Sequence, residues 1–228
     1  MKKIFTTTLL CAICTFTFAQ TRIGVKAGVT LPTMSSYSTA QSFDGPSEYN
    51  FKSTVSFYIG GTIDYPVSER FALQPGLTLT GKGGKTEVFE SNFEPNNLFS
   101  FQGTYELSTM YLEVPVNAMF NFNLGAGKIF FGAGPYYAFA ISGTAKRNGM
   151  ATSSSITTIS SKQDVDFGSN KDYKSGDFGL NFLAGYQLKS GFNIHTGYGL
   201  GLTSIDTDGF DETSLKNRVF SVGLGFSF

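Results

Sequence analysis

Residues 109–122 read TMYLEVPVNAMFNF, and this stretch decides the fold. Apolar residues recur at every second position, and mostly polar residues stand between them. A helix would scatter these apolar residues around its circumference, whereas a strand gathers them on one face. One face carries Met110, Leu112, Val114, Val116, Ala118, Phe120 and Phe122, and the other includes Glu113, Asn117 and Asn121. The stretch is therefore predicted to be a β-strand with one apolar face.

Seven further segments show the same two-residue period. They cover residues 22–31, 54–67, 71–82, 129–142, 177–188, 192–202 and 219–228. Short connections at 68–70, 123–127 and 189–191 alternate with long polar ones at 32–53, 83–108, 143–176 and 203–216. This alternation of short and long connections is typical of outer-membrane barrels, in which short turns face the periplasm and long loops face outward.

Backbone pairing in lipid decides between an open sheet and a closed one. Every N–H and C=O group in the hydrocarbon region must pair within the protein, so the first strand should pair with the last. The prediction is an all-β fold: a closed, eight-stranded antiparallel up-and-down transmembrane β-barrel. It has short periplasmic turns and four long extracellular loops.

The composition by itself resembles that of a soluble protein, with 41% hydrophobic residues and a mean hydropathy of −0.02. However, the chain contains 24 Phe, 11 Tyr and 27 Gly and lacks Trp. An excess of aromatic residues and glycine suits a sheet whose apolar side faces lipid and whose crowded interior needs small residues.

The first 19 residues are predicted to be a signal peptide, which leaves residues 20–228 as the barrel domain. Lys2 and Lys3 form a basic start, an uncharged apolar stretch follows, and the segment ends in small Ala19. Export through the general secretion pathway to the bacterial outer membrane is expected. Both cysteines lie in this leader. The rest of the chain has 15 Lys and Arg against 17 Asp and Glu, a formal net charge of −2. This near-neutral charge argues against nucleic acid as a partner.

Four short motifs stand out along the chain: residues 18–20 read FAQ, 23–28 read IGVKAG, 111–116 read YLEVPV and 226–228 read FSF. Together they resemble the PorT-like outer-membrane β-barrel family of Bacteroidota-type bacteria. The resemblance spans the mature chain, although the motifs mostly encode strand geometry. It implies an outer-membrane location without implying one activity, and the better-known members of the family are linked to protein secretion.

The aromatic C-terminus predicts a biogenesis partner as well as contact with outer-membrane lipid. Phe226 and Phe228 end an alternating strand and resemble the signal that the barrel-assembly machinery recognises. A simple lipid-facing position near the interface is the structural alternative, and both can hold at once.

Polar residues at the strand positions that face the lumen predict a hydrogen-bonded network there. In an eight-stranded barrel the interior is just filled by side chains, and charged groups in it must be ion-paired or hydrated. Glu113 is expected to form an ion pair with a cation in the lumen, and Lys26 is the best candidate. The functional alternative is that Glu113 belongs to a catalytic pair of carboxylates. The predicted network consists of Lys26, Asp64, Gln74, Glu113, Asn117, Asn121, Asn181, Gln187 and His195.

Two further features of the sequence could carry chemistry. His195 is the only histidine, so it offers neither a zinc site nor a Ser-His-Asp set. Asp206, Asp208 and Asp211 resemble the first half of a calcium loop, but Asn217 stands at the twelfth position in place of glutamate. A solvated acidic turn is therefore favoured.

The Ser/Thr tract at 152–161 is expected either to extend the wall of the barrel as a hairpin or to stay mobile.

The predicted function is that of a non-enzymatic barrel, without cofactor, whose extracellular loops bind a partner or contact the envelope. A narrow pore or an accessory component of a secretion apparatus is one alternative. An acyl-transfer or protease-type enzyme is another, and a soluble lipocalin-like barrel with the opposite parity is a third.

Overall fold

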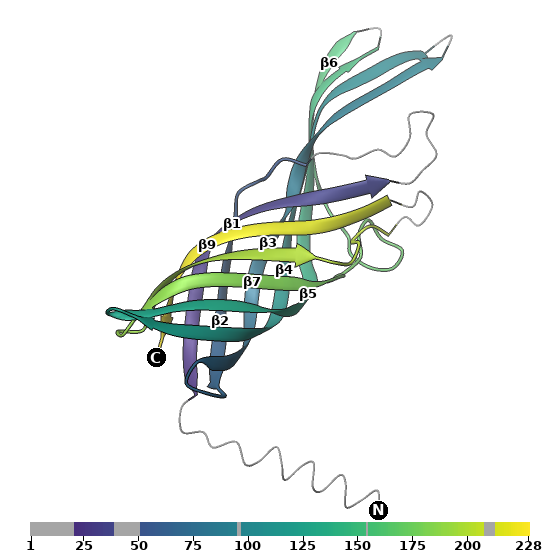
Figure 1. The fold of residues 1–228 in the computed structure, drawn as a ribbon. Helices are drawn as coiled ribbons and strands as arrows, with labels where there is room; N and C mark the ends of the chain where they lie inside the picture. The colour runs from purple at the N-terminus through teal and green to yellow at the C-terminus, as the bar shows by residue number, and fades with distance from the viewer. Residues whose placement is uncertain (1–20, 39–50, 95–96, 154, 208–212) are drawn as a thin grey trace, which may run out of the picture.

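The computed structural model describes residues 21–38, 51–94, 97–153, 155–207 and 213–228, so the predicted leader lies outside the described part (Figure 1). No helix in these ranges is long and apolar enough to cross a membrane. Nine strands form one antiparallel sheet: β1 Arg22–Ser38, β2 Ser56–Pro66, β3 Phe71–Glu94, β4 Asn97–Leu124, β5 Gly127–Thr152, β6 Ile156–Asp164, β7 Gly176–Leu188, β8 Phe192–Gly201 and β9 Thr213–Ser227.

Eight of these strands close into a ring. β4 pairs with β5, β5 pairs with β7, and the first strand β1 pairs with the last strand β9 from Gly24–Ser227 to Ser38–Thr213. The predicted closed eight-stranded barrel is thus confirmed. The ninth strand, β6, pairs only with the far part of β5 and stands outside the ring.

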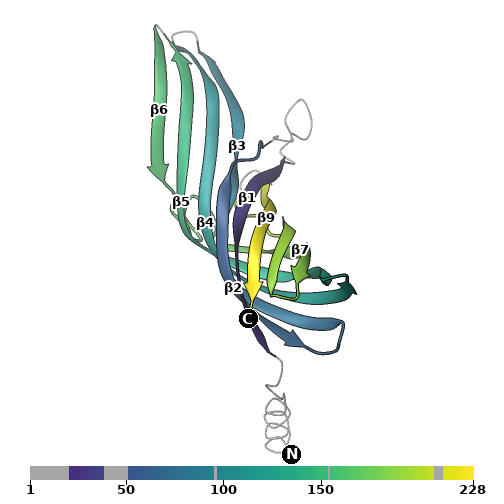
Figure 2. The same cartoon turned by 90° about the vertical axis from the view of Figure 1, so that its left-hand side faces the viewer.

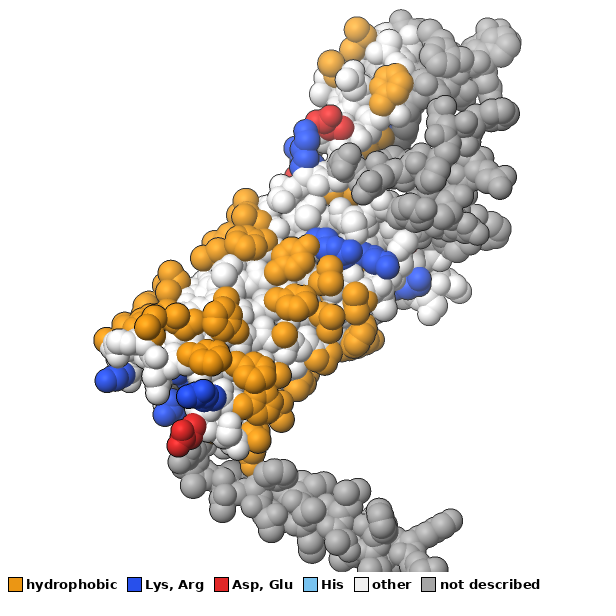
Figure 3. All heavy atoms as spheres, viewed as in Figure 1, with side chains coloured by type: hydrophobic (Ala, Val, Ile, Leu, Met, Phe, Trp, Pro, Cys, Tyr) orange, Lys and Arg blue, Asp and Glu red, His pale blue; other side chains and the backbone are white. Residues whose placement is uncertain are grey.

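The outer face of the ring is apolar, as the alternation predicted. Val25, Ile59 and Leu224 are each 50–54% exposed although they lie in the middle of strands. Figure 3 shows a broad group of orange, hydrophobic side chains on the face of the barrel that it draws. Such a band is stable only against lipid. The soluble lipocalin-like alternative requires the opposite parity, with the apolar face turned inward, and the structure contradicts it.

Small residues let the inner face close around its polar and aromatic side chains. A Cβ atom on Gly223 of β9 would overlap the Tyr58 hydroxyl and the carbonyl oxygen of Ala27. Similarly, a Cβ on Gly134 of β5 would overlap the carbonyl oxygen of Val116. Glycine at these inward positions therefore makes room for neighbouring strands and side chains.

Three strands continue far beyond the ring. We call the resulting four-stranded unit the projecting sheet: residues 83–94 of β3, 97–109 of β4, 143–152 of β5, and β6 (Figure 2). Much of it had been predicted as loop, at 83–108 and 143–176, and that part of the prediction is wrong. The reason is that backbone pairing between long strands stabilises the sheet without the apolar alternation that lipid imposes. β3 enters the sheet at Gly83, whose φ of 128° favours glycine.

Candidate functional site

The centre of the lumen holds a buried ion cluster made of Lys82, Glu113 and Asp177. The Lys82 Nζ atom lies 2.9 Å from Glu113 Oε2 and 3.0 Å from Asp177 Oδ2. These residues are only 3%, 7% and 0% exposed. One cation on β3 therefore bridges two carboxylates that come from β4 and β7, the two strands that flank β5 in the ring.

Neighbouring side chains complete the cluster. Asn181 donates a hydrogen bond of 2.9 Å to Glu113, and Asn217 donates one of 3.0 Å to Asp177. The Tyr136 hydroxyl lies 3.3 Å from the Asp177 carboxylate, and its ring lies 4.1 Å from Lys82 Nζ. These contacts satisfy charges that would otherwise be costly at this depth.

The structure corrects the predicted partner of Glu113, which is Lys82 rather than Lys26. Lys26 is only half-buried, makes no ion pair with Glu113, and contributes a longer-range attraction. Parity identifies the face of a strand, but it does not give the height at which side chains from different strands meet. Lys82 and Asp177 were missed, although both had inward parity at the ends of predicted strands.

A second polar group surrounds His195. Its Nε2 atom lies 2.6 Å from the Tyr58 hydroxyl and its Nδ1 atom lies 2.8 Å from Asn193 Oδ1. His195 is therefore held by a tyrosine on β2 and an asparagine on its own strand, and both of its ring nitrogens have hydrogen-bond partners.

The short turns lie at one end of the ring, which we call the turn end, and the opposite end is the loop end. At the turn end the lumen opens into a cavity of about 540 Å³ lined in part by Asp64, Gln74, Asn121, Gln187 and Lys26. Gln74 donates a 2.6 Å hydrogen bond to Asp64, and Gln187 donates to the carbonyl oxygen of Gly191 at 3.3 Å. The predicted polar residues are therefore spread over two levels, one beside Lys82 and one facing this cavity.

Asn117 lies between these two levels and has 0% exposure. Neither atom of its amide has a hydrogen-bond partner among the described residues. A buried amide of this kind is costly unless water reaches it.

Towards the loop end an apolar layer covers the ion cluster. It consists of Met34, Leu107, Val165, Ile205 and Leu215, of which Leu107 and Ile205 are almost completely buried. Above it the Tyr105 and Tyr173 hydroxyls lie 3.2 Å apart, and burial together with this contact raises the pKa of Tyr173. The ion cluster and this layer occupy most of the section of the barrel above this cavity, and a void of only about 50 Å³ remains beside Lys82 and Glu113.

The predicted calcium residues are placed only in part. Asp206 forms an isolated backbone bridge with Tyr173, while Asp208 and Asp211 lie outside the described residues. Within the described ranges, no three His, Cys, Asp or Glu side chains are grouped to hold a metal ion.

The C-terminal phenylalanines lie at the turn end. The backbone N–H of Phe228 donates to the carbonyl oxygen of Ile23, and its side chain is 72% exposed. The Phe226 and Phe228 rings meet edge to face with centroids 5.0 Å apart. This places an aromatic pair where the last strand joins the first.

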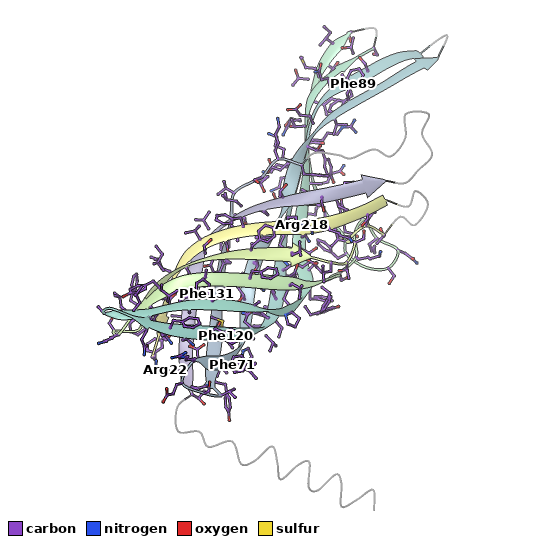
Figure 4. All side chains as sticks on the ribbon, in the orientation of Figure 1. Arg22, Phe71, Phe89, Phe120, Phe131 and Arg218 are labelled. Atoms are coloured by element: carbon purple, nitrogen blue, oxygen red, sulfur yellow. The ribbon has the colours of Figure 1, made fainter. Side chains whose placement is uncertain are left out.

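The two faces of the projecting sheet differ. On the inward face, Phe101 is completely buried beneath the Arg147 guanidinium, which lies 4.0 Å from the ring centroid. Cβ atoms on Gly103 or Gly149 would lie within 2.8 Å of this ring, so it rests on glycine backbone. On the outward face, Phe89, Met150 and Ile156 are 71%, 56% and 72% exposed. We call these three residues the tip patch (Phe89 is labelled in Figure 4).

A closed antiparallel ring with an outward apolar band defines a transmembrane β-barrel. The chain belongs to the family described as outer membrane protein beta-barrel domain, which matches residues 18–207. The family assigns the chain to the bacterial outer membrane. No curated protein matches the sequence closely enough to indicate a relationship.

Several solved structures resemble the chain at low identity. The attachment invasion locus protein Ail of Yersinia pestis is 13% identical, with 89% of this chain and 98% of Ail covered and a TM-score of 0.33. Neisserial surface protein A is 12% identical, with 90% and 97% covered and a TM-score of 0.38. The outer membrane protease OmpT of Escherichia coli is 12% identical, with 94% and 98% covered and a TM-score of 0.33.

Proposed function

We propose that the protein is a non-enzymatic binding protein whose loop end contacts a partner outside the cell or in the envelope. The projecting sheet carries this proposal. β3, β4 and β5 have 24, 28 and 26 residues, whereas a strand needs only about 9–11 to cross the membrane. The excess length builds a rigid surface on the outside, if the long connections face outward as in other outer-membrane barrels.

The tip patch supplies the contact residues. Phe89 and Met150 flank Gln102 in one cross-strand row, because Phe89 pairs with Gln102 and Gln102 pairs with Met150. Large apolar side chains gathered on a surface that lipid does not cover mark an interaction site. On the opposite face, the buried Phe101 and the half-buried Arg147 that covers it hold the sheet rigid beneath the tip patch.

The alternatives have less support. A pore would have to pass both the ion cluster and the apolar layer. An acyl-transfer or protease-type enzyme would need a Ser or Cys nucleophile beside its base, and the group that contacts His195 Nε2 is the phenol of Tyr58. An accessory role in secretion, which the PorT-like resemblance suggests, would use the same tip patch. We also propose that residues 1–19 direct export through the general secretion pathway and that Phe226 and Phe228 engage the barrel-assembly machinery.

Photo-crosslinking in intact cells tests the proposal. A photoreactive residue at Gln102, beside the tip patch, should give a discrete adduct, whereas the same residue at Ser190 in a turn should not. Replacing Phe89 and Met150 by Ser should weaken the adduct. Adducts of equal yield from both positions, or none from Gln102, would contradict the proposal. Sustained conductance steps in a planar bilayer would favour the pore instead.

A further inference from the structure

A row of lysines crosses the base of the projecting sheet. Lys52 bridges to Lys85, Lys85 pairs with Glu106, Glu106 pairs with Lys146, and Lys146 pairs with Lys162. Five neighbouring segments thus contribute one charged residue each to a single cross-strand row, and four of the five are lysines. We call these four residues the lysine row.

The row lies on the outward face, which continues the lipid-facing surface of the ring. Along β4, Leu112 is an exposed apolar residue of the band, and Met110, Ser108 and Glu106 follow at two-residue steps on the same face. The Lys52 and Lys146 side chains are 67% and 41% exposed. Figure 3 shows blue side chains beside red ones on this part of the sheet, beyond the orange band.

The local carboxylates do not neutralise the row. Glu87 pairs with Lys52 at 2.5 Å, and Glu106 pairs with Lys146 at 3.4 Å. Among the residues that the structure places, Lys85 and Lys162 have no ion pair or side-chain hydrogen bond. The nearby Asp164 lies two residues closer to the ring along β6, opposite Thr144.

Like charges directly opposite one another in a sheet are destabilising. The row contains two such pairs, because Lys52 faces Lys85 and Lys146 faces Lys162. Glu87 and Glu106 each pair with only one lysine of a couple, so external anions would relieve the remaining repulsion. The arrangement is therefore one that a binding partner would stabilise.

A second pair of cations lies at a similar boundary on β9. Lys216 and Arg218 have the same parity as the lipid-facing Phe220, and Arg218 is only one step beyond it (labelled in Figure 4). The Arg218 Nη1 atom donates to the carbonyl oxygens of Gly201 and Asn217, which fixes the guanidinium on the barrel surface. Cations therefore also border the apolar band on β9.

We propose that the lysine row binds the phosphate groups of anionic lipid headgroups in the surrounding membrane leaflet. Glu106 lies four residues beyond Met110 along β4, or roughly 13 Å at the usual rise per residue. With the strand tilted by about 40°, this rise is roughly 10 Å along the membrane normal, and the long lysine side chains reach back from there to the polar layer, which is about 5–7 Å thick. Each lysine near a layer of anionic headgroups adds attraction, and four of them lie side by side across the sheet. The lysine row acts independently of the tip patch, which lies farther out on the sheet.

Native mass spectrometry of the full-length folded protein tests the proposal. The protein is equilibrated in micelles with diphosphorylated lipid A or with zwitterionic phosphatidylcholine, and retained lipid is counted. The wild type should retain lipid A in preference. The variant Lys85→Gln/Lys162→Gln should lose roughly 25-fold in lipid A affinity, at about fivefold for each lysine. The charge-preserving variant Lys85→Arg/Lys162→Arg should retain it, and heat-modifiable gel migration confirms that each variant is folded.

Three results would overturn the proposal. Equal lipid A retention by the glutamine variant and the wild type would remove the role of the lysines. Equal losses in the arginine and glutamine variants would show that charge is not responsible. If soluble polyglutamate bound through the same lysines while lipid A retention stayed constant, the row would serve an acidic protein instead of the membrane.

Discussion

Replacing Lys82 by Met should destabilise the barrel more than any other single loss of charge in the lumen. Lys82 is 3% exposed and contacts both Glu113 and Asp177 within 3.0 Å, so its removal leaves two carboxylates buried without a cation. Removing one partner of a buried ion pair costs about 3–5 kcal/mol. With a urea slope of about 2 kcal/mol per M, the unfolding midpoint should fall by roughly 2 M.

The assay is urea unfolding of the protein in lipid vesicles, followed by the shift in gel migration between folded and boiled forms. The control is Lys52→Met, which removes a lysine from a pair whose side chains are 67% and 72% exposed and should leave the midpoint unchanged. Adding Glu113→Gln and Asp177→Asn to Lys82→Met should recover most of the loss, because no buried charge then remains unpaired. A midpoint for Lys82→Met equal to that of the Lys52→Met control would refute this reasoning.

Three other outcomes are expected. Gly223→Val should push the Tyr58 hydroxyl away from His195 and lower the thermal unfolding temperature in detergent, and an unchanged temperature would mean that the lumen is loosely packed there. Lys52 holds the pKa of Glu87 below its ordinary value, so the pair should persist as pH falls until that lowered pKa is reached; Lys52→Gln should move the titration of Glu87, followed by carbon NMR, to higher pH. Deleting Phe228 should slow assembly in cells without preventing refolding of the purified protein, and equal assembly rates would argue for a purely lipid-facing role.

The ring was predictable because lipid imposes a strict rule on sequence. In each strand that crosses the membrane, lipid-facing apolar residues must alternate with lumen-facing ones. The outward direction of residues such as Ile59 and Leu224 can therefore be predicted from the sequence. Closure between β1 and β9 followed from the need to pair every backbone group in the membrane. Both features depend on the alternation of residues within each strand and on the inability of lipid to hydrogen-bond the backbone.

The projecting sheet was not predictable in the same way. Residues 83–94 read GGKTEVFESNFE, a stretch too polar and irregular to look like a membrane strand. Outside the membrane no lipid selects one face, so hydrogen bonds to β4 stabilise the strand whatever the alternation. Only the Ser/Thr tract, through its β-propensity, suggested the hairpin that β6 completes.

The ion cluster depended on geometry that a single strand does not contain. The predicted polar residues Glu113 and Asn181 do meet, at 2.9 Å. Whether Lys26 or Lys82 reaches Glu113 depends on the stagger between strands, which sets the height of each residue in the lumen. Parity alone leaves that choice open.

The most direct test of the closed barrel is a disulfide between its first and last strands. Val29 on β1 pairs with Val222 on β9, and the predicted mature chain has no cysteine of its own. In isolated outer membranes, the Val29→Cys/Val222→Cys variant should cross-link under a membrane-soluble oxidant and then resist full unfolding on boiling until reduced. A failure to cross-link, with the protein released from the membrane by a carbonate wash, would contradict a closed outer-membrane barrel.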